Sequence, residues 1–130
     1  MKIVSTIARY LLGLMFTVFG LNGFLNFLPM MPMPPLAGRF LGVLVESHYM
    51  ILVFIIQLVC GLLFLANRYV PLALTLIAPV IVNILLFHGL MDASGIGPGV
   101  FTTLCWLVVF YNVRPAFSGI LQRQVQEHAR

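Results

Sequence analysis

Long apolar runs alternate along this chain with short breaks rich in proline, glycine or polar residues. Four runs, at residues 10–27, 49–66, 71–90 and 100–113, are close to the length of a bilayer-crossing helix. The fourth is short unless it begins one turn earlier. Because alternation with a period of two is absent, and backbone groups in lipid must pair within their own segment, the pattern predicts helices rather than barrel strands.

The breaks between the runs carry the residues expected of turns. Four prolines lie between residues 29 and 35, the second break reads Asn67-Arg68-Tyr69, and the third, at 92–99, begins at Asp92 and contains three glycines. The sequence therefore predicts an all-α, integral membrane four-helix bundle that forms a single domain over residues 1–130.

Two segments outside the runs have apolar residues on one helical face. In residues 36–47 that face holds four apolar residues, whereas Arg39 and Glu46 lie elsewhere. The apolar four are Leu36, Phe40, Val43 and Leu44. In the tail at 116–127 the spacing i, i+4, i+8 recurs at Phe117, Leu121 and Val125. Between the first two spans we predict a short amphipathic helix on the outer surface, or a re-entrant segment leading into the second span, and after the last span an amphipathic tail. For both segments a surface-lying helix without a special role is the simpler interpretation, and partner binding is the alternative.

Composition and charge agree with a membrane protein. Hydrophobic residues make up 62% of the 130 positions and charged residues 8%, and the mean hydropathy is +1.09. A soluble domain of this length could not bury so much apolar surface, so lipid must solvate it. The first run is long for a signal peptide and lacks a small-x-small cleavage site, which predicts an uncleaved helix.

Basic residues predict the orientation. With four spans both termini lie on one side of the membrane, and six basic residues fall on that side against Arg39 alone on the other. The six are Lys2, Arg9, Arg68, Arg114, Arg123 and Arg130. The positive-inside rule then gives an N-in, C-in topology. Because the basic residues are scattered singly, the net charge of +4 indicates contact with anionic lipid headgroups and not with nucleic acid.

Polar side chains inside the runs are the candidate ligand-binding residues, because an amide or imidazole in lipid costs free energy unless it is satisfied. They gather in the outer half of the membrane: Asn22, Asn26, Gln57, Asn83 and His88. Asn83 lies about 10 Å and His88 about 3 Å from the outer end of their run. The simpler interpretation is hydrogen bonding between helices, at about 0.6 kcal/mol each, with His88 bonded to a headgroup, water or Asp92. Both interpretations stay open.

Other residues narrow the chemistry. Gly13, Thr17 and Gly20 form a stripe suited to close helix packing, within the chain or in a dimer. Cys60 and Cys105 are single, so self-contained thiol–disulfide catalysis is not expected. His48 and His88 could ligate haem or a metal, but no carboxylate–His spacing supports this, and we predict no metal site. No nucleotide-binding loop or catalytic triad is present, so no catalytic residue is assigned.

Several strings of the chain resemble one family. These are FGLNGFLNF at 19–27, GLL at 61–63, RYVP at 68–71 and APVIVNILLFH at 78–88. Over residues 5–115 the sequence resembles the DoxX-like family of small four-helix bacterial membrane proteins. The resemblance implies a multi-pass protein of the bacterial cytoplasmic membrane. It also implies a link to membrane-associated oxidoreductases, since the family is named for a subunit of a thiosulfate:quinone oxidoreductase. Distant relatives are cargo receptors or assembly factors. Many members carry a lysine where this chain reads Asn22 to Asn26, so any role of that lysine does not carry over.

Two functions are compatible with these features. The first is a redox-linked membrane subunit that binds a quinone or similar amphipathic ligand through Asn22, Asn26, Gln57, Asn83 and His88, with a peripheral or soluble partner supplying electrons. The second is a non-enzymatic scaffold or assembly factor whose polar residues hold the bundle together. A small-solute transporter is a weaker third interpretation, because without an inverted repeat the chain would need to form a homo-oligomer.

Overall fold

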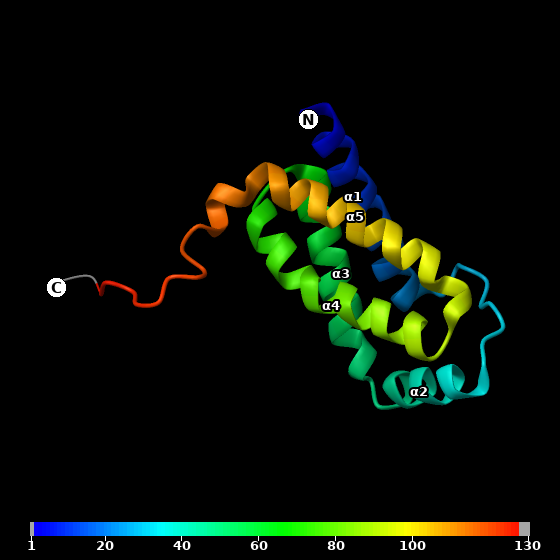
Figure 1. Cartoon of the computed structure of the whole chain (residues 1–130). Coiled ribbons are helices and arrows are strands. Elements are labelled where there is room, and N and C mark those ends of the chain that lie inside the picture. Colours follow the sequence, from blue (N-terminus) through cyan, green and yellow to red (C-terminus); the bar gives the residue numbers. More distant parts are fainter. Residues whose placement is uncertain (1, 128–130) are drawn as a thin grey trace.

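The computed structural model describes residues 2–127, and these fold into helices with no strand among them (Figure 1). The elements are α1 (Lys2–Leu25), α2 (Pro35–Glu46), α3 (Tyr49–Ala66), α4 (Val70–Leu90), the 3₁₀ turn η1 (Ala93–Gly95), α5 (Ile96–Val113) and the 3₁₀ turn η2 (Arg114–Phe117). Four segments are long and apolar enough to cross a membrane, the fourth joining α5 to both 3₁₀ turns. The predicted all-α architecture with four membrane-spanning helices is confirmed.

The predicted boundaries hold best where the apolar runs are uninterrupted. α3 matches its predicted range, and α4 begins one residue before it. α5 begins at Ile96, one turn before residue 100; Pro98 lies in its first turn, where the missing proline N–H is not needed. α1 begins at Lys2 rather than at residue 10. Polar residues lower the hydropathy of its first two turns without breaking the helix, and the Thr6 hydroxyl donates to the Lys2 carbonyl at 2.9 Å.

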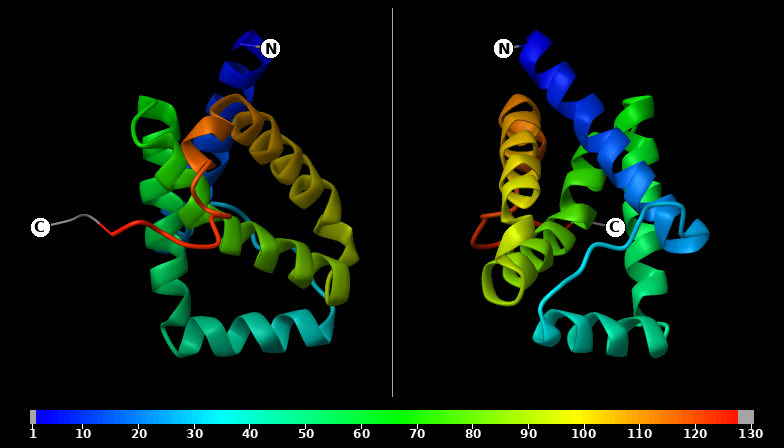
Figure 2. Two further views of the ribbon diagram at one scale, coloured as in Figure 1. Left: turned by 60° about the vertical axis from the view of Figure 1, so that its left-hand side comes forward. Right: turned by 90° about the vertical axis from the view of Figure 1, so that its right-hand side faces the viewer.

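The four long helices form a closed ring. α1 packs against α3 and α5, and α4 packs against the same two helices. The α1–α3 pair makes the most extensive contact. The right-hand view of Figure 2 shows α1 running obliquely across α3. The side chains that are almost fully buried come from all four helices: Leu12, Phe64, Leu74, Ile77 and Val109, with Cys60 between them. The ring therefore encloses an apolar core.

Small residues allow the close approach of α1 and α3. A β-carbon on Gly20 would lie 2.7 Å from the backbone nitrogen of Leu58, and one on Gly13 would lie 2.7 Å from the Leu65 side chain. Gly61 on α3 faces Thr17 on α1 in the same way. The predicted stripe of small residues thus packs within the chain, against α3.

The predicted amphipathic helix between the first two spans is present as α2, which lies across the end of the bundle where α3 begins (Figure 2). Ala37 is its buried residue, and the ring of Phe40 lies 6.1 Å from that of Phe87 near the end of α4. Leu36 and Val43 on the predicted apolar face stay exposed, as expected of a helix that offers one side to the bundle and another to lipid.

The tail differs from the prediction. Residues 114–117 form the 3₁₀ turn η2, and residues 118–127 form turns and irregular backbone instead of an amphipathic helix. Pro115 ends the preceding helix α5 at Val113, and Gly119 disfavours a new helix in the tail, because glycine loses the most conformational entropy in a helix. Leu121 and Val125 are consequently exposed.

Candidate functional site

Asn22 and Asn26 lie at the C-terminal end of α1, where they shape its termination. The backbone N–H of Asn26 donates to the Asn22 carbonyl at 2.8 Å, and Asn26 has a φ of 50°, a left-handed conformation that asparagine tolerates well. The Asn22 Oδ1 accepts a 2.8 Å hydrogen bond from the backbone N–H of Leu28. Asn22 through its side chain and Asn26 through its backbone thus shape the turn that leads away from the first helix.

Gln57 is the predicted site residue that lies inside the bundle. Its side chain is 8% exposed, and its Oε1 is buried with no hydrogen-bond partner within residues 2–127. The hydroxyl oxygen of Thr17, across the α1–α3 interface, is in the same situation. A buried polar atom without a partner costs about 1–3 kcal/mol, so these two atoms are the unsatisfied positions of the core.

Asn83 lies on the exposed side of α4 rather than inside the bundle. Its Nδ2 donates to the Pro79 carbonyl at 2.8 Å, one turn earlier on the same helix. Thr75 is exposed on the same face and donates to the Pro71 carbonyl at 2.9 Å. The spacing of Thr75, Pro79 and Asn83 places them on one stripe that points away from the ring.

His88 lies where α4 ends, and its ring is held by its neighbours. Its Nδ1 is 3.0 Å from the backbone oxygen of Asp92, and the Phe87 ring meets it nearly at right angles with a centroid distance of 5.0 Å. A β-carbon on Gly95 would collide with the imidazole. Of the partners considered for His88, the structure supplies Asp92, through its backbone and not its carboxylate.

The five predicted residues do not line one common site. Asn22 and Asn26 terminate α1, Gln57 lies on the buried side of α3, Asn83 faces outward, and His88 is packed at the end of α4. Two hollows, one at the basic end of the bundle and one beside α2, are lined by none of the five. Neither hollow is therefore the quinone-type site that was predicted in the outer half.

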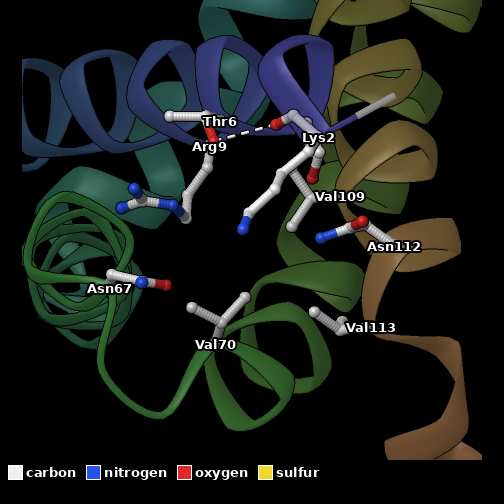
Figure 3. A pocket seen from close by; sticks show the side chains of 9 residues that line it. Lys2, Thr6, Arg9, Asn67, Val70, Val109, Asn112 and Val113 are labelled. Carbon is white, nitrogen blue, oxygen red and sulfur yellow. Dashed lines mark hydrogen bonds between the residues drawn. The ribbon is translucent and has the colours of Figure 1, made fainter.

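One hollow lies at the opposite, basic end of the bundle, between α1, the α3–α4 turn and α5 (Figure 3). Its volume is about 140 Å³. Its polar lining comes from Lys2, Ser5, Thr6, Arg9, Asn67 and Asn112, and its apolar lining from Val70, Val109 and Val113. The sequence prediction missed it because it considered polar residues inside the apolar runs, whereas Lys2, Arg9 and Asn67 lie just outside them. The sequence signal was present, since Arg9, Asn67 and Asn112 all lie near the inner ends of predicted spans.

A second hollow, of about 510 Å³, is shallow and mainly apolar. It lies between the methionine- and proline-rich loop after α1 and the helix α2. Its lining combines Met30, Met31, Pro32 and Met33 with Gly38, Leu41, Gly42 and Val45.

Comparisons with protein-family models, with curated proteins and with solved structures give no match to this chain. The site must accordingly be interpreted from its own residues. Within residues 2–127 no three His, Cys, Asp or Glu side chains come together as metal ligands would, and Cys60 and Cys105 are buried as free thiols. What the structure does offer is hydrogen bonding on the α4 face and positive charge at the basic end.

Proposed function

We propose that this multi-pass membrane protein is a non-enzymatic scaffold or assembly subunit that holds a partner protein in the membrane. The observation that supports this function is the position of Asn83. Its hydrogen bond to Pro79 uses Nδ2, so Oδ1 remains as an acceptor on the exposed face of α4. A polar atom facing lipid is costly, and a donor on a neighbouring helix would satisfy it.

The face around Asn83 suits a second helix. Thr75 and Pro79 lie on the same stripe and present small or compact side chains. Helices pack in membranes through small residues and interhelical hydrogen bonds, which contribute about 0.6 kcal/mol each on average. The proposed role matches that of the assembly factors among distant relatives of the DoxX-like family. Membership of this chain in that family is part of the same proposal.

Site-specific photo-crosslinking in native membranes tests the scaffold role. A photoreactive amino acid at Leu86, which is exposed beside Asn83, should give a discrete crosslink to one membrane protein. The same group at Leu104, exposed on α5, should give only lipid adducts. The substitution Asn83→Leu should abolish the Leu86 crosslink without changing the amount of protein in the membrane. Lipid adducts alone at both positions would reject the scaffold role.

A redox-linked subunit that binds a quinone-like ligand is the second candidate, and Gln57 favours it. The unpaired Oε1 of Gln57 and the unpaired hydroxyl oxygen of Thr17 could each bond a donor brought by a ligand that reaches the buried side of its helix. Mass spectrometry after mild detergent extraction tests this. Wild type should carry quinone and Gln57→Leu should lose it, whereas an extract free of quinone in both counts against the redox candidate.

The proposed location is the bacterial cytoplasmic membrane, with both termini inside. Lys2 and Arg9 line the same hollow as residues of the α3–α4 turn and the end of α5. The basic N-terminus, the turn with Arg68 and the segment with Arg114 therefore lie on one side of the bundle. The positive-inside rule assigns such a basic side to the cytoplasm. A fluorescent protein that matures only in the cytoplasm should fluoresce when fused to the C-terminus. Fluorescence only from a fusion in the loop after α1 would contradict this topology.

A further inference from the structure

The hollow at the basic end is lined by hydrogen-bond donors. Figure 3 shows the Lys2 ammonium and the Asn112 amide pointing into it and Asn67 across from Asn112, whereas the Arg9 guanidinium is turned toward the end of α3. Within residues 2–127 the lining includes two cations and no carboxylate. Its volume of about 140 Å³ is well above the roughly 10–15 Å³ that a single water needs. The hollow is therefore roomy, polar and positively charged.

Arg9 is held at this hollow but is not saturated. Its Nη1 donates to the backbone carbonyl of Phe64, near the end of α3, and its guanidinium lies over the Tyr10 ring at 4.5 Å from the centroid. A guanidinium has five N–H donors, so this bond leaves most of them for another acceptor. The half-buried position makes the charge less screened than on an open surface.

Aromatic residues place the hollow at the level of the lipid headgroups. Tyr10, Tyr69 and Tyr111 are exposed at the same end of the bundle, and the Arg114 guanidinium lies 4.0 Å from the centroid of the Tyr111 ring. Tyrosines gather at the boundary between hydrocarbon and water, and basic pockets between helices on the cytoplasmic side bind anionic headgroups. A lipid phosphate would thus meet Lys2 and Arg9 without leaving its own depth in the membrane.

We infer that this hollow binds the phosphate group of an anionic phospholipid of the inner leaflet. Lys2 and Arg9 supply the positive charges that neutralise the phosphate. Arg9 also has a planar guanidinium whose N–H groups match the spacing of phosphate oxygens. Asn67 and Asn112 can donate through their amides from the two sides of the site. The acyl chains would lie along the exposed apolar surface of α1 on the hydrocarbon side of Tyr10, which includes Leu14 and Val18.

Native mass spectrometry of the full chain tests the lipid site. The protein is released from nanodiscs made of equal amounts of phosphatidylglycerol and phosphatidylcholine, and the bound lipids are counted. Wild type should retain phosphatidylglycerol preferentially. Lys2→Gln and Arg9→Gln should each lower that preference about fivefold, the ratio that corresponds to roughly 1 kcal/mol per basic residue. Lys2 is exposed, so its variant keeps the test valid if Arg9→Gln does not fold.

Arg68→Gln is the matched control, because Arg68 lies in the same turn as Asn67 but outside the lining. It should leave the preference unchanged. Equal retention of both lipids by wild type would overturn the proposal. It would also be overturned if Arg68→Gln lowered the preference for phosphatidylglycerol as much as Lys2→Gln does, because general surface charge would then explain the binding. A further arm adds inorganic phosphate to protein in phosphatidylcholine nanodiscs. A thermal stabilisation by phosphate that Lys2→Gln removes would overturn the lipid assignment in favour of a soluble anion.

Discussion

A β-carbon on Gly61 would lie 2.5 Å from both the backbone nitrogen and the hydroxyl oxygen of Thr17. Backbone atoms of a packed helix cannot yield as a flexible side chain can, so α1 and α3 must separate if this glycine gains a side chain. We predict that Gly61→Ala lowers the free energy of unfolding by about 1–3 kcal/mol, the usual cost of overpacking. Equilibrium unfolding in one detergent measures it.

Gly89→Ala is the control for that substitution. Gly89 lies in α4 with nothing within 4 Å of a built β-carbon, so alanine there should raise stability by about 0.5–1 kcal/mol through its better helix propensity. Equal effects of the two variants would show that α1 and α3 pack less closely than the structure indicates.

Gln57→Leu should stabilise the purified chain. Leucine fills a similar volume and removes the buried Oε1 that has no partner within residues 2–127, so we expect a gain of about 1 kcal/mol. Gln57→Glu should destabilise it by several kcal/mol, because a carboxylate would be buried without a counter-charge. Thermal unfolding of ligand-free protein gives the sign. A loss of stability in the leucine variant would indicate that the amide has a partner in the native protein.

Gly95→Ala should move the His88 ring with little loss of stability. The new methyl group would occupy the position of the imidazole, and rotation of the ring would break the 3.0 Å contact between its Nδ1 and the Asp92 backbone oxygen. We expect less than about 1.5 kcal/mol of destabilisation, the net value of a hydrogen bond. Imidazole NMR signals should shift. Unchanged signals would contradict the packing of His88 against Gly95.

Trp106→Phe should weaken the contact between α5 and α4. The indole Nε1 donates to the Leu74 carbonyl at 3.0 Å, whereas its stacking on Phe110, at 5.1 Å and 7°, can be kept by phenylalanine. The loss should be about 1 kcal/mol. Leu107→Phe, on the exposed side of α5, serves as the control and should change unfolding by less than about 0.5 kcal/mol.

The fold was predictable because lipid imposes a simple rule on the backbone. Each apolar run of sufficient length had to be a helix, and α3 follows its run residue for residue. The rule does not predict the start of a helix whose first turns are polar, because such residues can be helical without being hydrophobic. Ser5, Thr6 and Arg9 are too polar for an apolar run, yet they continue α1, and they do so at the hollow that the sequence prediction overlooked.

The candidate site was less predictable because depth does not determine the direction in which a side chain points. Asn83 lies within α4, as its run predicted, but apolar residues surround that helix on every side, so the sequence pattern does not show which face is buried. The fold turns Asn83 outward and Gln57 inward. Similarly, the spacing of Phe117, Leu121 and Val125 fits a helix, but the segment forms turns and irregular backbone, and Gly119 within it disfavours a helix.

The ring of helices has a consequence for how the protein is made. α1 is synthesised before α5, which it contacts where the Thr102 hydroxyl lies 3.6 Å from the Met15 sulfur. One flank of α1 therefore has to wait in the membrane, covered by lipid or by an insertion factor, until α5 has left the ribosome.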